Sequence, residues 1–515
     1  MFAVKHSFEK SAALSLRQIL RSNKKSRPRW GGISALVLYV ALAGPPFLFG
    51  SRDAMTVAAW CALLGAGLMF APTHRLRKGH LLLLAGLGFV LLCFGFVLHE
   101  QLADHPWVAP FNPIWAKASE ALGKQLTPSV SIVRGEPFFA LGHPLANVLA
   151  LVLGLIVGVD PERARRGVRV MAWAGVGYAI YGIFALAFDP TEVLWREKTA
   201  YLGNLTATFI NRNTAACYFG SCAAVWLVLL MSAVRRNLPP GPLEWRKIPH
   251  HLLRRTHKDV LIRFVMLFVC LSAMFMTSSR GGVLVSLGVM VIAFMIFFAP
   301  DMPRGLGFVG AIAGSAATAL LLLQVLGGNV GSRIDLQGLS DAGRLSVYRS
   351  TIRIIADNPW FGTGLGTFAY AFPAYRSSDI SMQGRWDIAH NTYLEFASEL
   401  GIPLAIIAGV AWIVALAALV RGVRVRRRHM MVPLAALAVC LIGLLHSAID
   451  FSLQIAGYSI VLFALLGLGL GQAIYLRQAQ REQEPTRRRH AKGPLGGAES
   501  GKSVKLLPLI PQNDG

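Results

Sequence analysis

The sequence predicts an all-α polytopic membrane protein, and three observations support this fold class. The chain of 515 residues is 54% hydrophobic and only 15% charged, whereas soluble domains carry about 25% charged residues. Apolar runs of about 20 residues, the length that crosses a bilayer, recur along the chain. Basic residues fall between these runs rather than on one compact region. The formal charge of +25 therefore reflects membrane topology, and we expect no binding of nucleic acid.

The apolar runs predict about 12 transmembrane helices. They lie near 31–50, 54–71, 80–98, 138–158, 168–188, 214–234, 261–278, 281–300, 305–326, 397–420, 431–446 and 453–475. The first run lacks an A-x-A cleavage pattern, so we expect a retained helix rather than a removed signal peptide. The six cysteines lie in or beside apolar runs and predict small buried side chains, not disulfides or a metal site.

The distribution of Lys and Arg predicts the orientation of the spans. With the N-terminus in the cytoplasm and alternating spans, most of the 51 Lys and Arg residues fall in inner segments. This assignment gives a basic cytoplasmic segment over 1–30, a transmembrane domain over 31–476 and a cytoplasmic tail over 477–515. The tail has no periodic apolar pattern, so we expect it to be disordered and to approach anionic headgroups. The outer loop 327–396 is long enough to carry its own structure.

Within this outer loop, "GRLSVYRSTIRIIADNPWFGTGLGTF" predicts a helix followed by a turn. Leu345, Tyr348 and Ile352 have helical spacing, and Asn358-Pro359 ends the helix. The amphipathic pattern predicts a helix that lies on the outer membrane surface. The glycines of "GTGLGTF" could cradle a phosphate, but the Lys-Ser/Thr pair of a P-loop is missing, which favours a plain turn.

Polar side chains gather at the predicted outer ends of several spans. Arg280 stands between two apolar runs, and an arginine at mid-bilayer costs at least about 2.5–3.5 kcal/mol. It either binds an anion near the outer surface or marks a tight turn. Arg212 and Asn213 directly precede another span. His446 and Asp450 are four residues apart, so they form either a buried structural pair or part of a site.

These segments resemble the O-antigen ligase and polysaccharide polymerase superfamily. Arg280-Gly-Gly-Val-Leu284 is similar to its R-x3-L element, and "HNTYLEFASELGIP", with His390 and Gly401, resembles its histidine motif at the entry to a membrane helix. The outer-loop segment quoted above and "ATFINRNTAACYFG" are also similar to segments of these proteins. The likeness covers roughly residues 207–476.

The resemblance implies a membrane glycosyltransferase bundle of the GT-C-like type, with a helical periplasmic subdomain, in the bacterial inner membrane. The active site would face the periplasm. The donor would be a glycan on undecaprenyl diphosphate, and the acceptor lipid A–core in a ligase or a growing polysaccharide in a polymerase. The resemblance implies neither a metal nor another cofactor. O-antigen ligation in lipopolysaccharide biosynthesis is the function we expect.

The residues offer chemistry for such a transfer. Arginine stays protonated and binds phosphate with two N–H groups, which points to Arg280, Arg344 and Arg212. A histidine can deprotonate a sugar hydroxyl near neutral pH, so His390 is the expected base, oriented by Asp387 or Glu395. Without a paired carboxylate, direct attack with inversion is expected. The remaining candidate substrate-binding residues are Asn213, Asn391, His446 and Asp450.

Two alternatives remain open. A polymerase of O-antigen or exopolysaccharide would share the fold, donor and Arg/His chemistry and differ in its acceptor. A transporter of lipid-linked oligosaccharide would also suit about 12 spans, but it predicts ionisable residues near mid-membrane and an internal repeat. In this sequence, the polar residues instead gather on the predicted outer side of the membrane.

Overall fold

The structure is a computed structural model that describes residues 30–238, 258–299, 301, 342–380, 386–425 and 430–491, with isolated positions between 310 and 321. The chain divides into two units, Met1–Tyr475 and Leu476–Gly515. In the first unit, the described secondary structure is helical apart from one short hairpin. In the second, the described residues 476–491 are helical.

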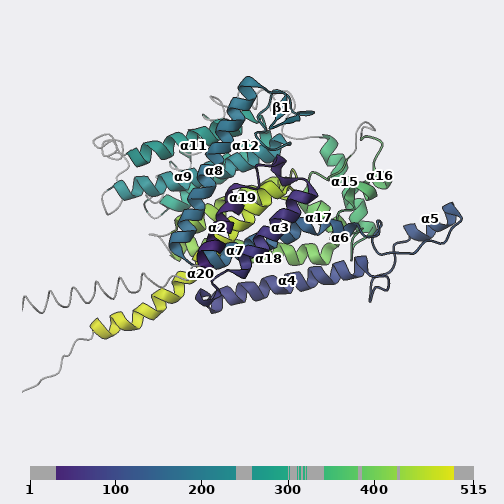
Figure 1. The fold of residues 1–515 in the computed structure, drawn as a ribbon, viewed down its shortest axis with the longest axis horizontal. Helices are drawn as coiled ribbons and strands as arrows, with labels where there is room; N and C mark the ends of the chain where they lie inside the picture. Colours follow the sequence, from purple (N-terminus) through teal and green to yellow (C-terminus); the bar gives the residue numbers. More distant parts are fainter. Residues whose placement is uncertain are drawn as a thin grey trace, which may run out of the picture. The chain divides into compact units, whose positions relative to one another are not determined.

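The N-terminal half contains α2 (Trp30–Ala43), α3 (Ala54–Met69), α4 (Lys78–Leu102), α5 (Ile114–Leu122), α6 (Glu136–Ala140), α7 (Gly142–Gly158), α8 (Pro161–Phe188) and α9 (Arg212–Asn237). β1 (Glu192–Val193) pairs with β2 (Arg196–Glu197) as an antiparallel hairpin before α9. The later helices are α11 (Lys258–Met276), α12 (Arg280–Phe298), α15 (Ala342–Asp357), α16 (Phe368–Tyr375), α17 (Thr392–Leu400), α18 (Ile402–Val425), α19 (Met431–Ser447) and α20 (Ala456–Ala491). Figure 1 shows their arrangement.

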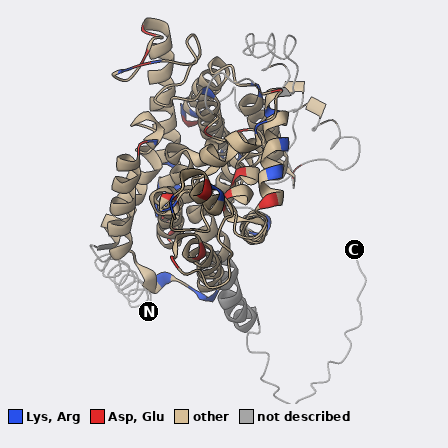
Figure 2. Ribbon diagram, turned by 90° about the vertical axis from the view of Figure 1, so that its right-hand side faces the viewer, with Lys and Arg blue, Asp and Glu red and all other residues tan. Residues whose placement is uncertain are grey.

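The all-α polytopic membrane fold is confirmed. Among the described residues, 8 helices are long and apolar enough to cross a membrane, and shorter apolar helices at Gly31–Ala43, Ala54–Met69 and Met431–Ser447 coincide with further expected spans. Most of the described ribbon carries neither acidic nor basic residues (Figure 2). The span expected near 305–326 falls largely outside the described residues, so the count of about 12 stays a prediction.

The predicted cytoplasmic segments at the two ends of the chain lie largely outside the described residues. The basic segment 1–30 lies outside the described residues, apart from Trp30 at the start of α2. α20 continues to Ala491, beyond residue 477, where the disordered tail was expected to begin. Residues 492–515 lie outside the described part of the chain.

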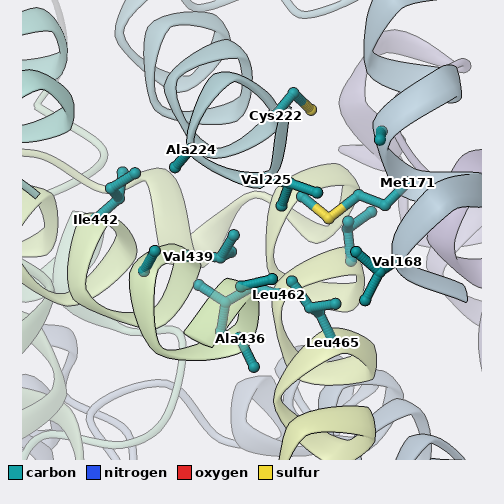
Figure 3. Close-up of a cluster of buried hydrophobic side chains, with 14 of the residues drawn as sticks. Val168, Met171, Cys222, Ala224, Val225, Ala436, Val439, Ile442, Leu462 and Leu465 are labelled. Carbon is teal, nitrogen blue, oxygen red and sulfur yellow. The ribbon is translucent and has the colours of Figure 1, made fainter. Parts of the chain in front are cut away.

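Burial separates inner helices from peripheral ones. In the apolar windows of α9 and α20, 78% and 83% of residues are buried, against 11% in α4 and α18. α9 and α20 therefore form the centre of the bundle, and α4 and α18 present most of their surface outward. Figure 3 shows the core where α8, α9, α19 and α20 meet, with Met171, Val225, Val439 and Leu462 in one cluster.

Glycines let α7 and α20 pack with their backbones almost in contact. A Cβ added at Gly471 would lie 2.6 Å from the carbonyl oxygen of Leu155, and one at Gly158 would lie 2.8 Å from the Cα of Leu468. A Cβ at Gly154 would collide with the carbonyl of Ala464. Small residues at such crossings are typical of membrane helices, where close packing replaces the hydrophobic driving force.

Contacts between connections define two ends of the bundle. At one end, which we call the basic end, Arg75 bonds Asp160 at 2.8 Å and Arg235 pairs with Asp301 at 3.6 Å. At the opposite end, Gly50 packs against Phe209 and Ile455, so the connections after α2, before α9 and before α20 meet there. We call this the site end, because the candidate residues described below lie on it.

At the site end, α15, α16 and α17 form a small helical subdomain (Figure 1). Its own apolar cluster includes Val347, Ile354, Phe368 and Phe372. The helix expected in this part of the outer loop is therefore present as α15. Its buried face uses Val347 and Ile354, whereas Leu345 and Ile352 of the expected apolar stripe stay exposed.

The glycine-rich turn after α15 packs as a plain turn, as expected. Gly362 and Gly364 have φ values of 67° and 113°, which favour glycine. The carboxylate of Glu399 accepts the backbone N–H of Phe368 at 2.9 Å. From α4, the side-chain amide of Gln101 donates to the carbonyls of Phe361 and Glu399 at 2.7 and 2.8 Å. The turn therefore forms hydrogen bonds within the protein, and these bonds link α4 to α17.

Candidate functional site

Asp450 lies where the candidate site residues meet. It stands in the connection between α19 and α20 and is only 1% exposed. Nδ1 of His390 lies 3.4 Å from its Oδ1, and Nη2 of Arg344 lies 3.7 Å from its Oδ2. The side-chain amide of Asn213 also donates to Oδ2. Asp450 thus joins residues from the α9 start, the α15 start and the segment before α17.

The charge state of Asp450 follows from these contacts. Burial acts to raise its pKa, because a carboxylate loses hydration in the interior. The contact with His390 and the nearby charges of His446 and Arg344 act in the opposite direction and outweigh burial, so the pKa of Asp450 lies below its ordinary value. The site therefore holds a buried carboxylate in its ionised form beside an imidazole.

His390 has an unusual backbone for a residue other than glycine. Its φ is 54°, in the left-handed region that such residues occupy infrequently. The hydroxyl of Tyr348 donates to the carbonyl of His390 at 2.9 Å. Its imidazole contacts the rings of Trp386 and Phe451, with centroids 5.6 and 4.9 Å away. These neighbours fix the direction of the imidazole, while its side chain stays 23% exposed.

His446 lies one turn before Asp450 and is 1% exposed. Its carbonyl accepts the backbone N–H of Asp450 at 2.9 Å, and its Nδ1 lies 3.0 Å from the hydroxyl of Ser452. A Cβ added at Gly281 would lie 4.0 Å from His446 Nε2. His446 therefore connects the Asp450 segment to the start of α12, which carries Arg280.

Arg280 and Arg212 are each the first residue of a membrane helix. Ser279 caps α12 by accepting the N–H of Gly282 at 3.3 Å, and Asn211 caps α9 by accepting the N–H groups of Asn213 and Thr214. The guanidinium of Arg212 lies 5.1 Å from the centre of the Tyr201 ring. Both arginines are thus held by capped helix starts at the site end.

Asn391 has a role in positioning the backbone. Its side-chain oxygen caps α17 by accepting the N–H groups of Tyr393 and Leu394, and its amide donates to the carbonyl of Ala448 at 3.0 Å. These bonds occupy both ends of the side chain. Asn391, predicted to bind substrate, here fixes the α17 start to the Asp450 segment.

Four helix N-termini converge on residues 448–450. α9 reaches them through the Asn213–Asp450 bond, and α17 through the Asn391–Ala448 bond. α15 contributes Arg344, whose Nη1 donates to the carbonyl of Ile449 at 2.7 Å. At α12, Gly281 is so close to Ile449 that a Cβ would lie 2.5 Å from its Cδ1. Each N-terminus carries roughly half a positive charge, so this arrangement favours a bound anion.

Some contacts were missed by sequence reasoning. Asp387 or Glu395 is expected to orient His390, and the structure adds a remote carboxylate, that of Asp450, with its Oδ1 3.4 Å from Nδ1 of His390. Glu395 accepts the backbone N–H of Ala389 at 2.7 Å. Tyr348 and Phe451 also surround His390, and no local pattern marks them as site residues.

Comparison with known proteins concerns the middle of the chain. Residues 265–409 match the family model described as O-antigen ligase. These residues, which we call the ligase domain, are similar to the O-antigen ligase family. Among curated proteins, none matches the chain.

The ligase domain contains Arg280, Arg344, His390 and Asn391 of the candidate site. Arg212, Asn213, His446 and Asp450 lie outside the matched residues. The sequence resemblance to the superfamily is therefore confirmed over residues 265–409, and the match supports a ligase-type or polymerase-type role in polysaccharide biosynthesis. The contacts described above join the ligase domain to α9 and to the α19–α20 connection.

Proposed function

We propose that the protein transfers a glycan from undecaprenyl diphosphate to a sugar hydroxyl, and that the reaction is ligation of O-antigen to lipid A–core. The observation that carries the proposal is the group of His390, Arg344 and Asp450, together with the arginines that begin α9 and α12. It combines a base with cationic groups for a diphosphate. The proposed working unit is the transmembrane domain 31–476.

The leaving group is the diphosphate of the donor. Its negative charge increases as the glycosidic bond breaks, and arginines that bind it stabilise this transition state. Arg280 and Arg212 stand on helix N-termini, which add positive potential at the same place. Arg344 contributes a third guanidinium, held by Ile449 and Asp450. Together they form the proposed diphosphate site.

His390 is the proposed base for the acceptor. Its Nδ1 lies 3.4 Å from Oδ1 of Asp450, and in the proposed scheme Nε2 is the atom presented to a sugar hydroxyl. Nε2 takes the hydroxyl proton, the oxygen attacks the anomeric carbon, and the diphosphate leaves with the bonding electrons. Asp450 stabilises the imidazolium that forms. One direct displacement inverts the anomeric centre, and no metal takes part in this scheme.

The proposed membrane is the bacterial inner membrane, with the site end in the periplasm. Lys and Arg prefer cytoplasmic segments, which assigns the basic end to the cytoplasm. At the site end, Trp107, Trp195 and Trp360 are 71%, 63% and 71% exposed. Exposed tryptophans are typical of the membrane–water boundary. The site therefore lies at the depth where a lipid-linked diphosphate meets water.

Reconstitution of the purified protein with lipid-linked glycan and lipid A–core tests the proposal. Ligation predicts glycan attached to the core and release of the lipid diphosphate. Longer glycan on the lipid carrier, with unmodified core, would instead identify a polymerase. An intact donor in both reactions would reject the transferase and favour a transporter. The description of the matching family favours ligation.

A further inference from the structure

Glu395 is a buried carboxyl group that the proposed reaction does not use. It lies in the first turn of α17 and is 8% exposed. A buried carboxyl group costs free energy unless hydrogen bonds compensate for its lost hydration. Its contacts lead to the two segments that carry His390 and Asp450. The helix itself has no need of this side chain, because Asn391 already caps it.

The first contact holds the segment before His390. Oε2 of Glu395 accepts the backbone N–H of Ala389 at 2.7 Å. On the other side of His390, Tyr348 donates to its carbonyl at 2.9 Å. The two bonds flank the residue whose φ is 54°. A left-handed conformation persists only where its surroundings enforce it, and these bonds supply that enforcement.

The second contact of Glu395 is with the segment that follows Asp450. The side chain of Gln454 interacts with the same carboxyl group. Gln454 ends the short helical turn Ser452–Gln454, which directly follows Asp450 and Phe451. Glu395 therefore lies between the segment that carries the imidazole and the segment that carries the carboxylate beside it.

We propose that Glu395 is a positioning residue that joins these two segments and thereby sets the contact between His390 and Asp450. This inference rests on the proposed function of His390 as the base. Glu395 touches neither substrate nor the reacting atoms in this role. It acts through Ala389 and Gln454, and the length of its side chain matters more than its charge.

The protonation of Glu395 fits this role. Burial is the main cause that raises its pKa, and the neighbouring Glu399 adds to the effect, so the neutral acid is favoured. Within the described residues, the buried Oε1 of Gln454 has no hydrogen-bond partner. The hydrogen bonds from Ala389 and Gln454 act in the opposite direction, because both lower the pKa of Glu395. A glutamine at 395 would resemble the neutral acid in shape and keep an acceptor for Ala389.

The test separates the effect of side-chain length from the effect of the acid group. Glu395→Gln keeps the length of the side chain and removes the acid, whereas Glu395→Asp keeps the acid and shortens the side chain by one methylene. We expect Glu395→Gln to retain most of the turnover. Glu395→Asp should lower kcat at least about tenfold with little change in KM for the donor, because the base and not the binding site is displaced.

A split between kcat and KM separates positioning from loss of fold. The groups around the contact are Asp450 and, beyond it, Arg344 and His446. If Glu395→Asp moves His390 away from Asp450, kcat falls while KM for the donor stays unchanged. In the Asp450→Asn background, the same change should lower kcat no further, because the two act on one contact.

Glu399→Gln is the matched control. Glu399 lies one turn later on α17 and is also buried, but it accepts the N–H of Phe368 in the glycine-rich turn. This variant should leave kcat close to that of the wild type. Wild-type kcat in folded Glu395→Asp would overturn the inference. If that variant fails to accumulate, Gln454→Ala removes the other contact and must lower kcat with little change in KM. Wild-type turnover of His390→Ala would instead reject the proposed function itself.

Discussion

Nδ1 of His390 and Oδ1 of Asp450 lie 3.4 Å apart, although one residue precedes α17 and the other follows α19. Asp450 comes from outside the ligase domain. A carboxylate this close favours the positive charge that an imidazole gains when it accepts a proton during a reaction. This pairing, rather than either residue alone, turns a histidine at the site end into a candidate base.

Replacement of His390 by alanine tests the base directly. His390→Ala should lower kcat by about 10²–10⁴-fold, the usual contribution of a general base. Donor binding should persist, because the arginines remain. Turnover of lipid-linked glycan by the purified variant measures the effect. His105→Ala, at an exposed position of the α4–α5 connection, should behave as the wild type. Equal activity of the two variants would remove His390 from the mechanism.

Asp450→Asn tests the carboxylate while keeping the shape of the side chain. An asparagine can still accept the N–H of Phe451, which Asp450 Oδ1 accepts at 2.8 Å. It cannot stabilise an imidazolium by charge, so kcat should fall by roughly 10²–10⁴-fold. Single-turnover transfer with saturating donor measures the chemical step. A variant with normal single-turnover rate and weakened donor binding would assign Asp450 to the substrate site.

The low pKa of Asp450 also predicts how stability depends on pH. Because its pKa in the folded protein lies below the ordinary 3.8, the folded state binds fewer protons than the unfolded state. The resulting stabilisation is present above 3.8 and is lost as pH falls through the folded-state value. Thermal unfolding in detergent should therefore show a difference between wild type and Asp450→Asn at neutral pH that shrinks in acid. A constant difference would contradict the assignment.

The sequence predicts much of this site because several of its residues flank apolar runs. Arg212, Arg280 and His390 can each be placed at the same end of the bundle by counting spans. The partner of His390 cannot be found in this way. Asp450 is remote in sequence, and the packing of α17 beside the α19–α20 connection brings it to His390. Spacing reports the end on which a residue lies, whereas tertiary packing decides its contacts.

The glycine crossing of α7 and α20 predicts a change in stability. A Cβ at Gly154 would collide with the carbonyl of Ala464 on the central helix α20. Gly154→Ala should therefore lower the free energy of unfolding by about 1–3 kcal/mol, the usual cost of overpacking. Thermal unfolding measures the loss. Gly177→Ala, on α8 with open space around its Cβ, is the matched control and should not destabilise. Equal stability of both variants would mean that the two helices do not cross so closely.

Arg280→Lys distinguishes an anion site from a tight turn. Lysine keeps the positive charge but cannot bind a phosphate with two N–H groups of a planar fork. We expect weaker donor binding, with a loss of about 1.5–3 kcal/mol for a charged hydrogen bond, measured as the Kd for lipid-linked diphosphate. Arg134→Lys is the control, because Arg134 pairs with Asp104 at an exposed position of the site end. If Arg280→Lys binds the donor as the wild type does, Arg280 serves the turn before α12. The diphosphate site would then depend on Arg344 and Arg212.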